Sequence, residues 1–231
     1  MWQHPGMSEA FYTEAQYLFA QRSFVELARS LSVDDWATPM PCTPGWTVRD
    51  ALSHVVGVAD DALAGRMDGA PGEAWTAAQI ERNRSLTVDE LLERWDHQAP
   101  AFAALLDPMG ERRPPFDCHA HEHDVRQALG RPGDRSSKLI EAAATGLATI
   151  GDCPVALTVE LADGRLVPSG PAGSAAVTIA GLTGFELFRS RLGRRSRDQV
   201  RGWAWSGVDV DIDAVVERWF IFGPSADPII E

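Results

Sequence analysis

The sequence predicts an α+β protein in which a helical bundle is followed by a small mixed domain. Its first part contains four segments whose apolar residues recur at the spacing of an amphipathic helix. From residue 154 onward, short alternating segments are separated by turns and then followed by helical segments, which indicates a small α+β domain. We therefore expect a four-helix bundle over residues 1–134, a bridging helix within residues 135–153 and the α+β domain over residues 154–231.

The first two helices are separated by a proline-rich loop. Apolar residues at near-helical spacing predict a helix from Ser8 to about Leu31, with no glycine or proline inside it. After the loop, Thr47 can cap a second helix because Asp50 stands three residues later, as in a capping box. His54 falls at the border of the broad apolar face of this second helix, a position where a single histidine is usually structural.

Two further helices complete the expected bundle. Thr87 and Glu90 form a second capping box at the start of the third helix, and Pro100 is expected to kink that helix. The fourth helix covers residues 116–130 and stops at Gly130, with a proline two residues beyond. Metal sites in such bundles are built from inward-pointing side chains of facing helices.

The remaining elements are expected in the C-terminal part of the chain. An alanine-rich stretch predicts one more helix at residues 136–150. The alternating segments predict strands at 156–161, 166–170 and 175–181, and helical spacing follows at 181–192 and 211–222. The first two of these strands are separated by an Asp-Gly pair, which is typical of a tight turn.

The composition is that of an ordinary globular protein with an acidic balance. A formal net charge of −12 and a pI near 4.9 argue against nucleic acid or an anionic membrane as a partner. No apolar run approaches the roughly 18 residues of a membrane span, and the N-terminus has no signal-peptide pattern, so we expect a cytoplasmic protein. The three cysteines are widely spaced, which predicts reduced thiols. Arginines cluster at residues 189–201, where they could serve a small anion.

The fourth helix contains three of the six histidines of the chain. At about 100° per residue, Asp117 and His121 lie together on the edge of its apolar arc, so both are expected to point into the bundle. His119 and His123 are also four residues apart, but they share the opposite face, which we expect to be solvated. Cys118 lies on the apolar arc, where an inert core thiol is expected.

His54, Asp117 and His121 together could hold a divalent metal ion with an open coordination position. Three protein ligands and a water are typical of catalytic zinc, whereas structural zinc is closed by four ligands. The same residues would also suit non-haem Fe(II), so the ligands do not choose the metal. Two alternatives stay open at this point: a purely structural His–Asp cluster, and a rival site at His119 and His123.

Two segments carry a resemblance to a known family. PCTPGWTVRDALSHVVG, at residues 41–57, and FDCHAHEHDVRQALGRPG, at residues 116–133, resemble two signatures of the DinB-like, maleylpyruvate-isomerase-type proteins of actinobacteria. Matched residue by residue, the metal ligands of that family fall on His54, Asp117 and His121. The family often appends a small α+β domain similar to a sterol-carrier fold, which agrees with the strands expected after residue 154.

The resemblance implies a DinB-like four-helix bundle that binds a divalent metal, usually zinc, and often uses mycothiol, the low-molecular-weight thiol of actinobacteria. A metal-coordinated thiol is deprotonated, so it could attack a small electrophilic substrate in an isomerase or S-transferase reaction. The chain departs from the isomerase at Asp117, where the isomerase typically has a glutamate. A catalytic arginine of the isomerase cannot be matched to one arginine of this chain.

Two other functional classes remain as alternatives to a thiol-dependent enzyme. The same ligands could activate a water molecule, which would make the protein a metal-dependent hydrolase. A bundle that binds a small ligand without catalysis would need no metal at all. Metal content and thiol dependence therefore separate the three hypotheses.

Overall fold

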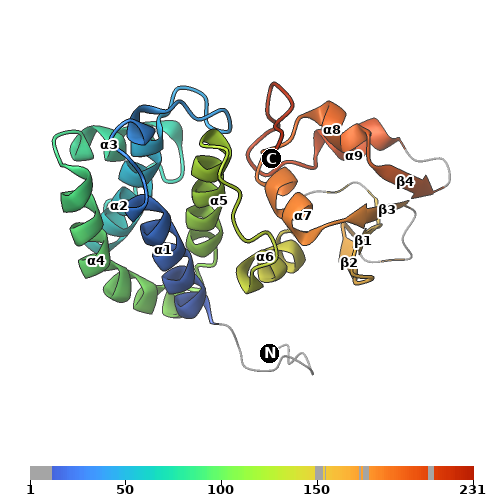
Figure 1. The fold of residues 1–231 in the computed structure, drawn as a ribbon. Coiled ribbons are helices and arrows are strands. Elements are labelled where there is room, and N and C mark those ends of the chain that lie inside the picture. Colours follow the sequence, from blue (N-terminus) through green and yellow to red (C-terminus); the bar gives the residue numbers. More distant parts are fainter. Residues whose placement is uncertain (1–11, 149–152, 154, 172, 174–176, 208–210) are drawn as a thin grey trace. The chain divides into compact units, whose positions relative to one another are not determined.

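The structure is a computed structural model that describes residues 12–148, 153, 155–171, 173, 177–207 and 211–231 (Figure 1). The chain divides into two compact units, residues 1–129 and residues 130–231. Helices make up the described part of the first unit, and a four-stranded sheet with helices makes up the second. The predicted α+β fold class is therefore confirmed.

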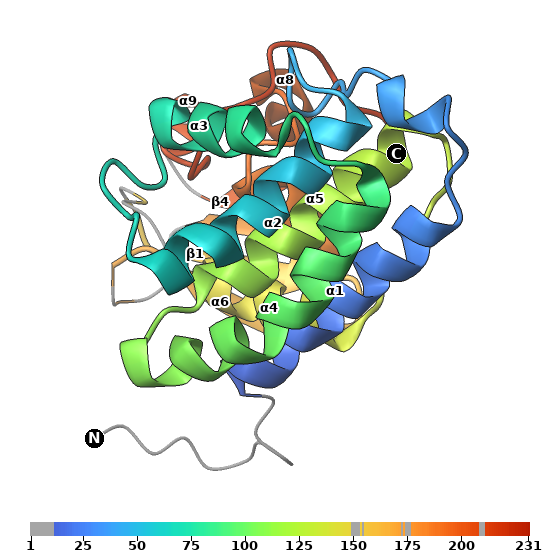
Figure 2. The ribbon, with the colours of Figure 1, turned by 90° about the vertical axis from the view of Figure 1, so that its left-hand side faces the viewer.

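The first unit is a bundle of four long helices with smaller additions. Its elements are α1 (Thr13–Arg29), η1 (Asp35–Ala37), α2 (Val48–Ala64), α3 (Glu73–Asn83), α4 (Val88–Met109) and α5 (Arg113–Ala128). Helix α5 packs against α1 and α2, and α4 packs against the same two helices (Figure 2). Helix α3 packs against the outside of α2. The bundle thus places α2 and α5 side by side, which brings their facing side chains together.

The ends of the bundle helices follow the predicted capping chemistry. The Thr47 hydroxyl accepts a hydrogen bond from the Asp50 backbone N–H, and the Asp50 carboxylate accepts one from the Thr47 backbone N–H. Thr87 and Glu90 form the same reciprocal pair at the start of α4. Helix α4 continues through Pro100 to Met109 without a break in its helical assignment. The predicted helix starts therefore hold at both capping boxes.

The expected solvated face of α5 is wrong. His119 and His123 are both buried, because α1 covers the side of α5 on which they lie. The Phe19 ring lies 6.0 Å from the His119 ring at a steep angle. The expectation failed because it assumed one apolar face for α5, whereas this helix contacts α1 on one side and α2 on another. His119, Glu122 and His123 are consequently interior residues.

The second unit contains a mixed sheet and short helices. Its elements are α6 (Lys138–Ala148), β1 (Leu157–Leu161), β2 (Leu166–Ser169), β3 (Val177–Leu182), α7 (Gly184–Arg191), α8 (Arg197–Arg201), β4 (Ala204–Gly207) and α9 (Ile212–Glu217). The strand order is β2-β1-β3-β4, with β1 parallel to β3 and the two outer pairs antiparallel. Helix α6 packs against α7 and therefore belongs to this unit.

Some elements of the second unit differ from the sequence-based expectation. Strand β4 and helix α8 were not predicted, because each spans only four or five residues and neither has clear periodicity. The predicted strands β1 and β2 are present and are joined by the expected turn. The predicted starts at Ser8 and residue 175 and the predicted end at residue 150 lie outside the described residues.

Candidate metal centre

The structure brings the three candidate ligands together at the contact between α2 and α5. His54 comes from α2, while Asp117 and His121 lie one turn apart on α5. His54 Nε2 is 3.4 Å from Asp117 Oδ2, and His121 Nε2 is 3.5 Å from Asp117 Oδ1. One ligand atom from each residue lies within 4.8 Å of the other two. The site therefore presents two imidazole nitrogens and one carboxylate to a common point.

These separations suit ligands around a metal better than direct hydrogen bonds. A charge-assisted N–H···O bond is typically about 2.7–2.9 Å long, shorter than either His–Asp distance. Zinc bonds to nitrogen and oxygen of about 2.0–2.1 Å in a tetrahedron place neighbouring ligand atoms about 3.3 Å apart. Two imidazoles and a carboxylate are also the donor types found at catalytic zinc. The residues present thus fit a divalent cation.

Each histidine of the site has a buried polar partner behind it. His54 Nδ1 lies 2.7 Å from Gln79 Oε1, and His121 Nδ1 lies 3.1 Å from Asp124 Oδ2. The first contact is a hydrogen bond, of the kind that orients a metal-binding imidazole and fixes which ring nitrogen carries the proton. The second is a charge contact without hydrogen-bond geometry. Sequence reasoning missed both partners. Asp124 was detectable, because it stands three residues after His121 on the same helix, but no sequence signal connects Gln79 with His54.

Two tryptophan side chains, Trp46 and Trp75, lie beside the imidazoles of the site. The Trp46 ring is nearly parallel to the His121 ring at a centroid distance of 5.5 Å, and it lies 5.2 Å from the His54 ring. Trp75 approaches His54 edge-on at 6.3 Å. The Asp117 side chain keeps 38% of its surface exposed, whereas the two histidine side chains are almost fully covered. The site is therefore accessible on the side of Asp117.

The charged groups of the site shift one another's pKa values. Burial raises the pKa of Asp117, but the adjacent His121 and His54 outweigh it and hold the pKa of this carboxyl well below its usual value. Burial lowers the pKa of His121, whereas Asp117 and Asp124 raise it above its usual value overall. The two histidines thus favour the ionised form of Asp117, which is the form in which a carboxylate binds a metal.

The rival pair His119 and His123 belongs to a different environment. His119 Nδ1 lies 2.9 Å from Glu122 Oε2, and Glu122 also accepts hydrogen bonds from Ser23 and Arg126. Within the described residues, His54, Asp117 and His121 form the group whose ligand atoms converge. Cys118 is buried as expected, and burial raises the pKa of its thiol well above the usual value. Its thiol is therefore an inert core group.

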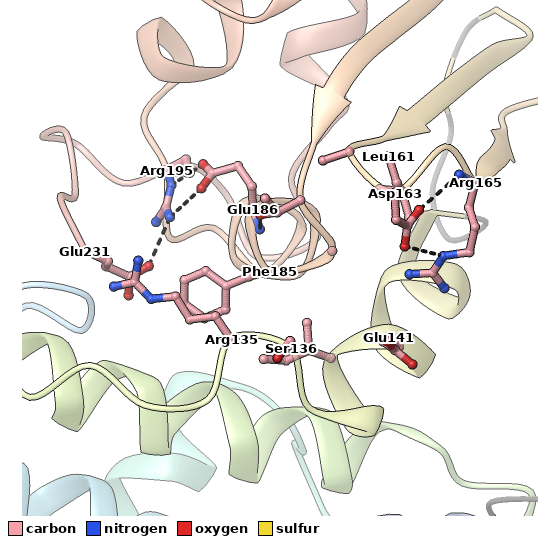
Figure 3. Close-up of a pocket in the computed structure, with 14 residues that line it drawn as sticks. Arg135, Ser136, Glu141, Leu161, Asp163, Arg165, Phe185, Glu186, Arg195 and Glu231 are labelled. Atoms are coloured by element: carbon pink, nitrogen blue, oxygen red, sulfur yellow. Dashed lines mark hydrogen bonds and ion pairs between the residues drawn. The ribbon is translucent and has the colours of Figure 1, made fainter.

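A second hollow lies entirely within the second unit. It has a volume of about 590 Å³, and its walls include Arg135, Phe185, Glu186, Arg195 and Glu231 (Figure 3). The Arg195 guanidinium pairs with the carboxylates of Glu186 and Glu231, and the Arg135 guanidinium lies 5.0 Å from the centre of the Phe185 ring. The charges lining this hollow are thus largely matched by one another.

The arginine cluster at residues 189–201 has internal partners in the same unit. Arg189 is fully buried and pairs with Glu231, while Arg191 donates to the backbone carbonyls of Leu147 and Trp219. Arg194 donates to the backbone carbonyl of Leu192. The other three pair with carboxylates: Arg195 with Glu186 and Glu231, Arg197 with Glu217, and Arg201 with Asp198 and Asp213. The arginines of the cluster therefore have partners within the second unit.

Part of the chain matches a known protein family. Residues 19–116 match the family described as the mycothiol maleylpyruvate isomerase N-terminal domain. The expected resemblance to this family is confirmed. The match covers less than half of the chain; it includes His54 and ends one residue before Asp117.

Two solved structures share the fold of this chain. They are the mycothiol-dependent maleylpyruvate isomerase and a mutant of it in which one histidine is replaced by alanine, at 12% and 11% sequence identity. Each has a TM-score of 0.51, with 84% of this chain and 91% of the other chain covered. The likeness to the isomerase therefore extends over both units at the level of fold.

Two further findings concern the whole chain and its helices. No curated protein matched it. None of the helices in the described residues combines the length and apolar character needed to cross a membrane.

Proposed function

We propose that this protein is a metal-dependent enzyme that uses mycothiol in an isomerase or S-transferase reaction. The observation that supports the proposal best is the convergence of His54, Asp117 and His121 at a site that is accessible on one side. Three ligands with an accessible side leave room for an exogenous molecule at the metal. The match to the mycothiol maleylpyruvate isomerase N-terminal domain supports a thiol as that molecule.

The bound cation, which we expect to be zinc, would lower the pKa of a coordinated thiol and so supply a thiolate at neutral pH. The chain contributes the ligand set and its charge. His54 and His121 are neutral donors when they bind a metal, so Asp117 is the only negative ligand and the loaded centre keeps a net positive charge that favours an anionic sulfur. Although it is shorter than glutamate, Asp117 reaches both imidazoles.

The proposed isomerisation requires no oxidant or reductant. The thiolate sulfur would form a C–S bond to the β-carbon of a cis-enoyl acid, and the electron pair of the C=C bond would move onto the conjugated carbonyl. Rotation about the resulting single bond, followed by cleavage of the C–S bond, would regenerate the thiolate and leave the trans isomer. In an S-transferase reaction, the sulfur would instead displace a leaving group. The half-buried indole of Trp46 provides an apolar surface for the substrate beside both histidines.

Metal content measured by mass spectrometry tests this proposal first. The wild-type protein is expected to hold about one divalent ion per chain, and Asp117→Ala is expected to lose it because the remaining pair of imidazoles binds weakly. His97→Ala is the matched control, because His97 is an exposed histidine on α4 and should leave the metal content unchanged.

Turnover assays then distinguish the reaction classes. The metal-loaded protein is expected to convert maleylpyruvate, or to conjugate an electrophile, only when mycothiol is present. Hydrolysis of a substrate without any thiol would assign the metal centre to a hydrolase instead. A wild-type protein that takes up no metal even after supplementation with divalent ions would contradict the proposal and leave a bundle that binds a ligand without catalysis.

A further inference from the structure

We propose that Gln79, backed by Asp61, is a positioning residue that fixes the tautomer of His54 so that Nε2 is the metal-binding nitrogen. The inference rests on the proposed metal centre but concerns residues outside its three ligands. Gln79 lies on α3 and Asp61 on α2, and both side chains are fully buried. Buried polar side chains of this kind are retained only with hydrogen-bond partners, so their contacts can be followed one by one.

A chain of hydrogen bonds leads from Asp61 to the metal centre. Two arginines, Arg66 and Arg82, donate to Asp61 Oδ1. The other carboxylate oxygen, Oδ2, accepts from Gln79 Nε2 at 3.0 Å. At its far end, Gln79 Oε1 lies 2.7 Å from His54 Nδ1. The side chain of Gln79 thus spans the distance between a buried carboxylate and a candidate metal ligand.

The direction of each bond follows from the groups involved. A carboxylate paired with two guanidinium groups is ionised and can only accept, so it must face the NH₂ end of the Gln79 amide. This leaves the amide oxygen facing His54, and an amide oxygen can only accept. His54 Nδ1 must therefore donate and carry the proton. The lone pair of the neutral ring is then on Nε2, the nitrogen that faces Asp117.

Close packing between α2 and α3 holds Gln79 in this position. Gly57, in the middle of α2, lies directly under the Gln79 side chain. A Cβ at Gly57 would come 2.6 Å from Gln79 Cβ and 2.8 Å from its Cγ. A glycine inside a helix normally costs stability, so its presence here has a packing reason. The absence of a side chain at residue 57 lets α3 approach until the amide reaches His54.

The arrangement makes an atom-level prediction for Asp61→Asn. The two arginines need an acceptor, so the amide oxygen of the new residue would keep the place of Oδ1 and its NH₂ would replace Oδ2. That NH₂ would face Gln79 as a donor, and the Gln79 amide would have to turn around. Its own NH₂ would then face His54 Nδ1, favouring the tautomer with the proton on Nε2. A substitution of nearly identical size would thus work against metal binding.

The test measures zinc affinity by competition with a chromophoric chelator in the full-length protein. Gln79→Leu and Asp61→Asn are each expected to weaken binding about 10- to 100-fold, as is typical when the partner of a metal-binding histidine is lost. Gln21→Leu is the matched control, because Gln21 is also a buried glutamine whose Nε2 donates to an aspartate, Asp96, at 2.7 Å. It lies on α1, which contributes none of the three candidate ligands, and its substitution should leave the affinity unchanged.

Proton NMR of the cobalt(II)-loaded protein provides a readout that loss of stability alone would not change. The wild type is expected to show two exchangeable ring N–H signals shifted by the metal, one from Nδ1 of each histidine ligand. In Gln79→Leu the His54 signal should exchange faster with water because it has lost its acceptor, while the signal of His121, which faces Asp124, stays as an internal reference.

The outcomes separate this inference from the proposed function. Wild-type zinc affinity and slow exchange in both Gln79→Leu and Asp61→Asn would overturn the positioning role while leaving the metal centre intact. A wild-type protein that binds neither zinc nor cobalt would overturn the metal centre and this role with it. If Gln79→Leu fails to fold, Asp61→Asn decides the question, because it changes a single atom type at the end of the chain of bonds.

Discussion

Glu122 joins three side chains at the contact between α1 and α5. Its carboxylate lies 2.9 Å from His119 Nδ1 and accepts hydrogen bonds of 2.8 Å from Ser23 Oγ and Arg126 Nε. Burial raises the pKa of this carboxyl, but the contacts with His119, Arg126 and Ser23 outweigh it and lower the pKa from 4.5 to about 2. Glu122 is therefore a buried anion that ties two bundle helices together.

The depressed pKa of Glu122 predicts a specific loss of stability in acid. Because its folded-state pKa is below the unfolded value, its contribution is complete above about pH 4.5 and disappears as the pH falls toward 2. Glu122→Gln should lower the free energy of unfolding at pH 7 by roughly 1–3 kcal/mol and weaken its dependence on pH in that window. Urea denaturation across this pH range checks both effects.

A matched control for Glu122 is available on α1, the helix that Glu122 ties to α5. Glu26 is an exposed acid on α1, so Glu26→Gln should change neither the stability at pH 7 nor its acid dependence. If Glu122→Gln showed the same acid dependence as the wild type, the anion at Glu122 would not be the source of the stability assigned to it.

The three histidines of α5 show what single-residue reasoning could and could not predict. Helical spacing alone placed Asp117 and His121 on one inward edge, and the structure places both beside His54. The same spacing could not show that α1 buries His119 and His123, since burial of a polar face depends on which helices pack around it. Contacts between distant segments, such as that of Gln79 with His54, cannot be predicted from the periodicity of the sequence.

At the scale of whole elements, the crossing of α2 and α3 depends on the space left at Gly57. Glycine to alanine inside a helix normally stabilises a protein by about 0.5–1 kcal/mol. Here the new Cβ would meet Gln79 Cβ at 2.6 Å, so the two helices would have to move apart. We expect Gly57→Ala to destabilise the protein by about 1–3 kcal/mol, the usual cost of overpacking, as measured by urea denaturation.

Another glycine tests whether this effect is specific to the crossing. Gly184 begins α7, and a Cβ there would meet Ala144 Cβ at 3.5 Å and Ile140 Cγ2 at 3.7 Å, which are ordinary contacts. Gly184→Ala should therefore be close to neutral. Stabilisation by Gly57→Ala would show that α2 and α3 can separate without cost, and it would weaken the packing argument for Gln79.

Elements with local signals were the ones that the sequence could predict. The capping boxes at Thr47 and Thr87 marked the starts of α2 and α4 because both partners lie within three residues of each other. Strand β4 contains Ala204-Trp-Ser-Gly and has no alternating pattern, so its place in the sheet depends on pairing with β3. Long helices with caps were thus predictable, whereas short elements defined by their neighbours were not.

At the scale of the whole molecule, the candidate chemistry is confined to one unit. All parts of the candidate centre lie within residues 1–129: the three proposed ligands, the side chains in contact with the two histidines, and the tryptophans beside them. The second unit has its own apolar core, centred on residues of the sheet and on Trp219. From the change of periodicity, the sequence led us to expect a bundle and a small α+β domain with a bridging helix between them, and α6 lies in the stretch expected to form that bridge.

This distribution predicts that metal binding does not require the second unit. Residues 1–129 expressed alone are expected to bind zinc about as tightly as the full chain, because every ligand and every residue that orients one is present. Zinc titration of the fragment against a competing chelator, alongside circular dichroism to verify its helical fold, makes the comparison. A folded fragment that binds zinc far more weakly than the full chain would mean that the second unit contributes to the centre.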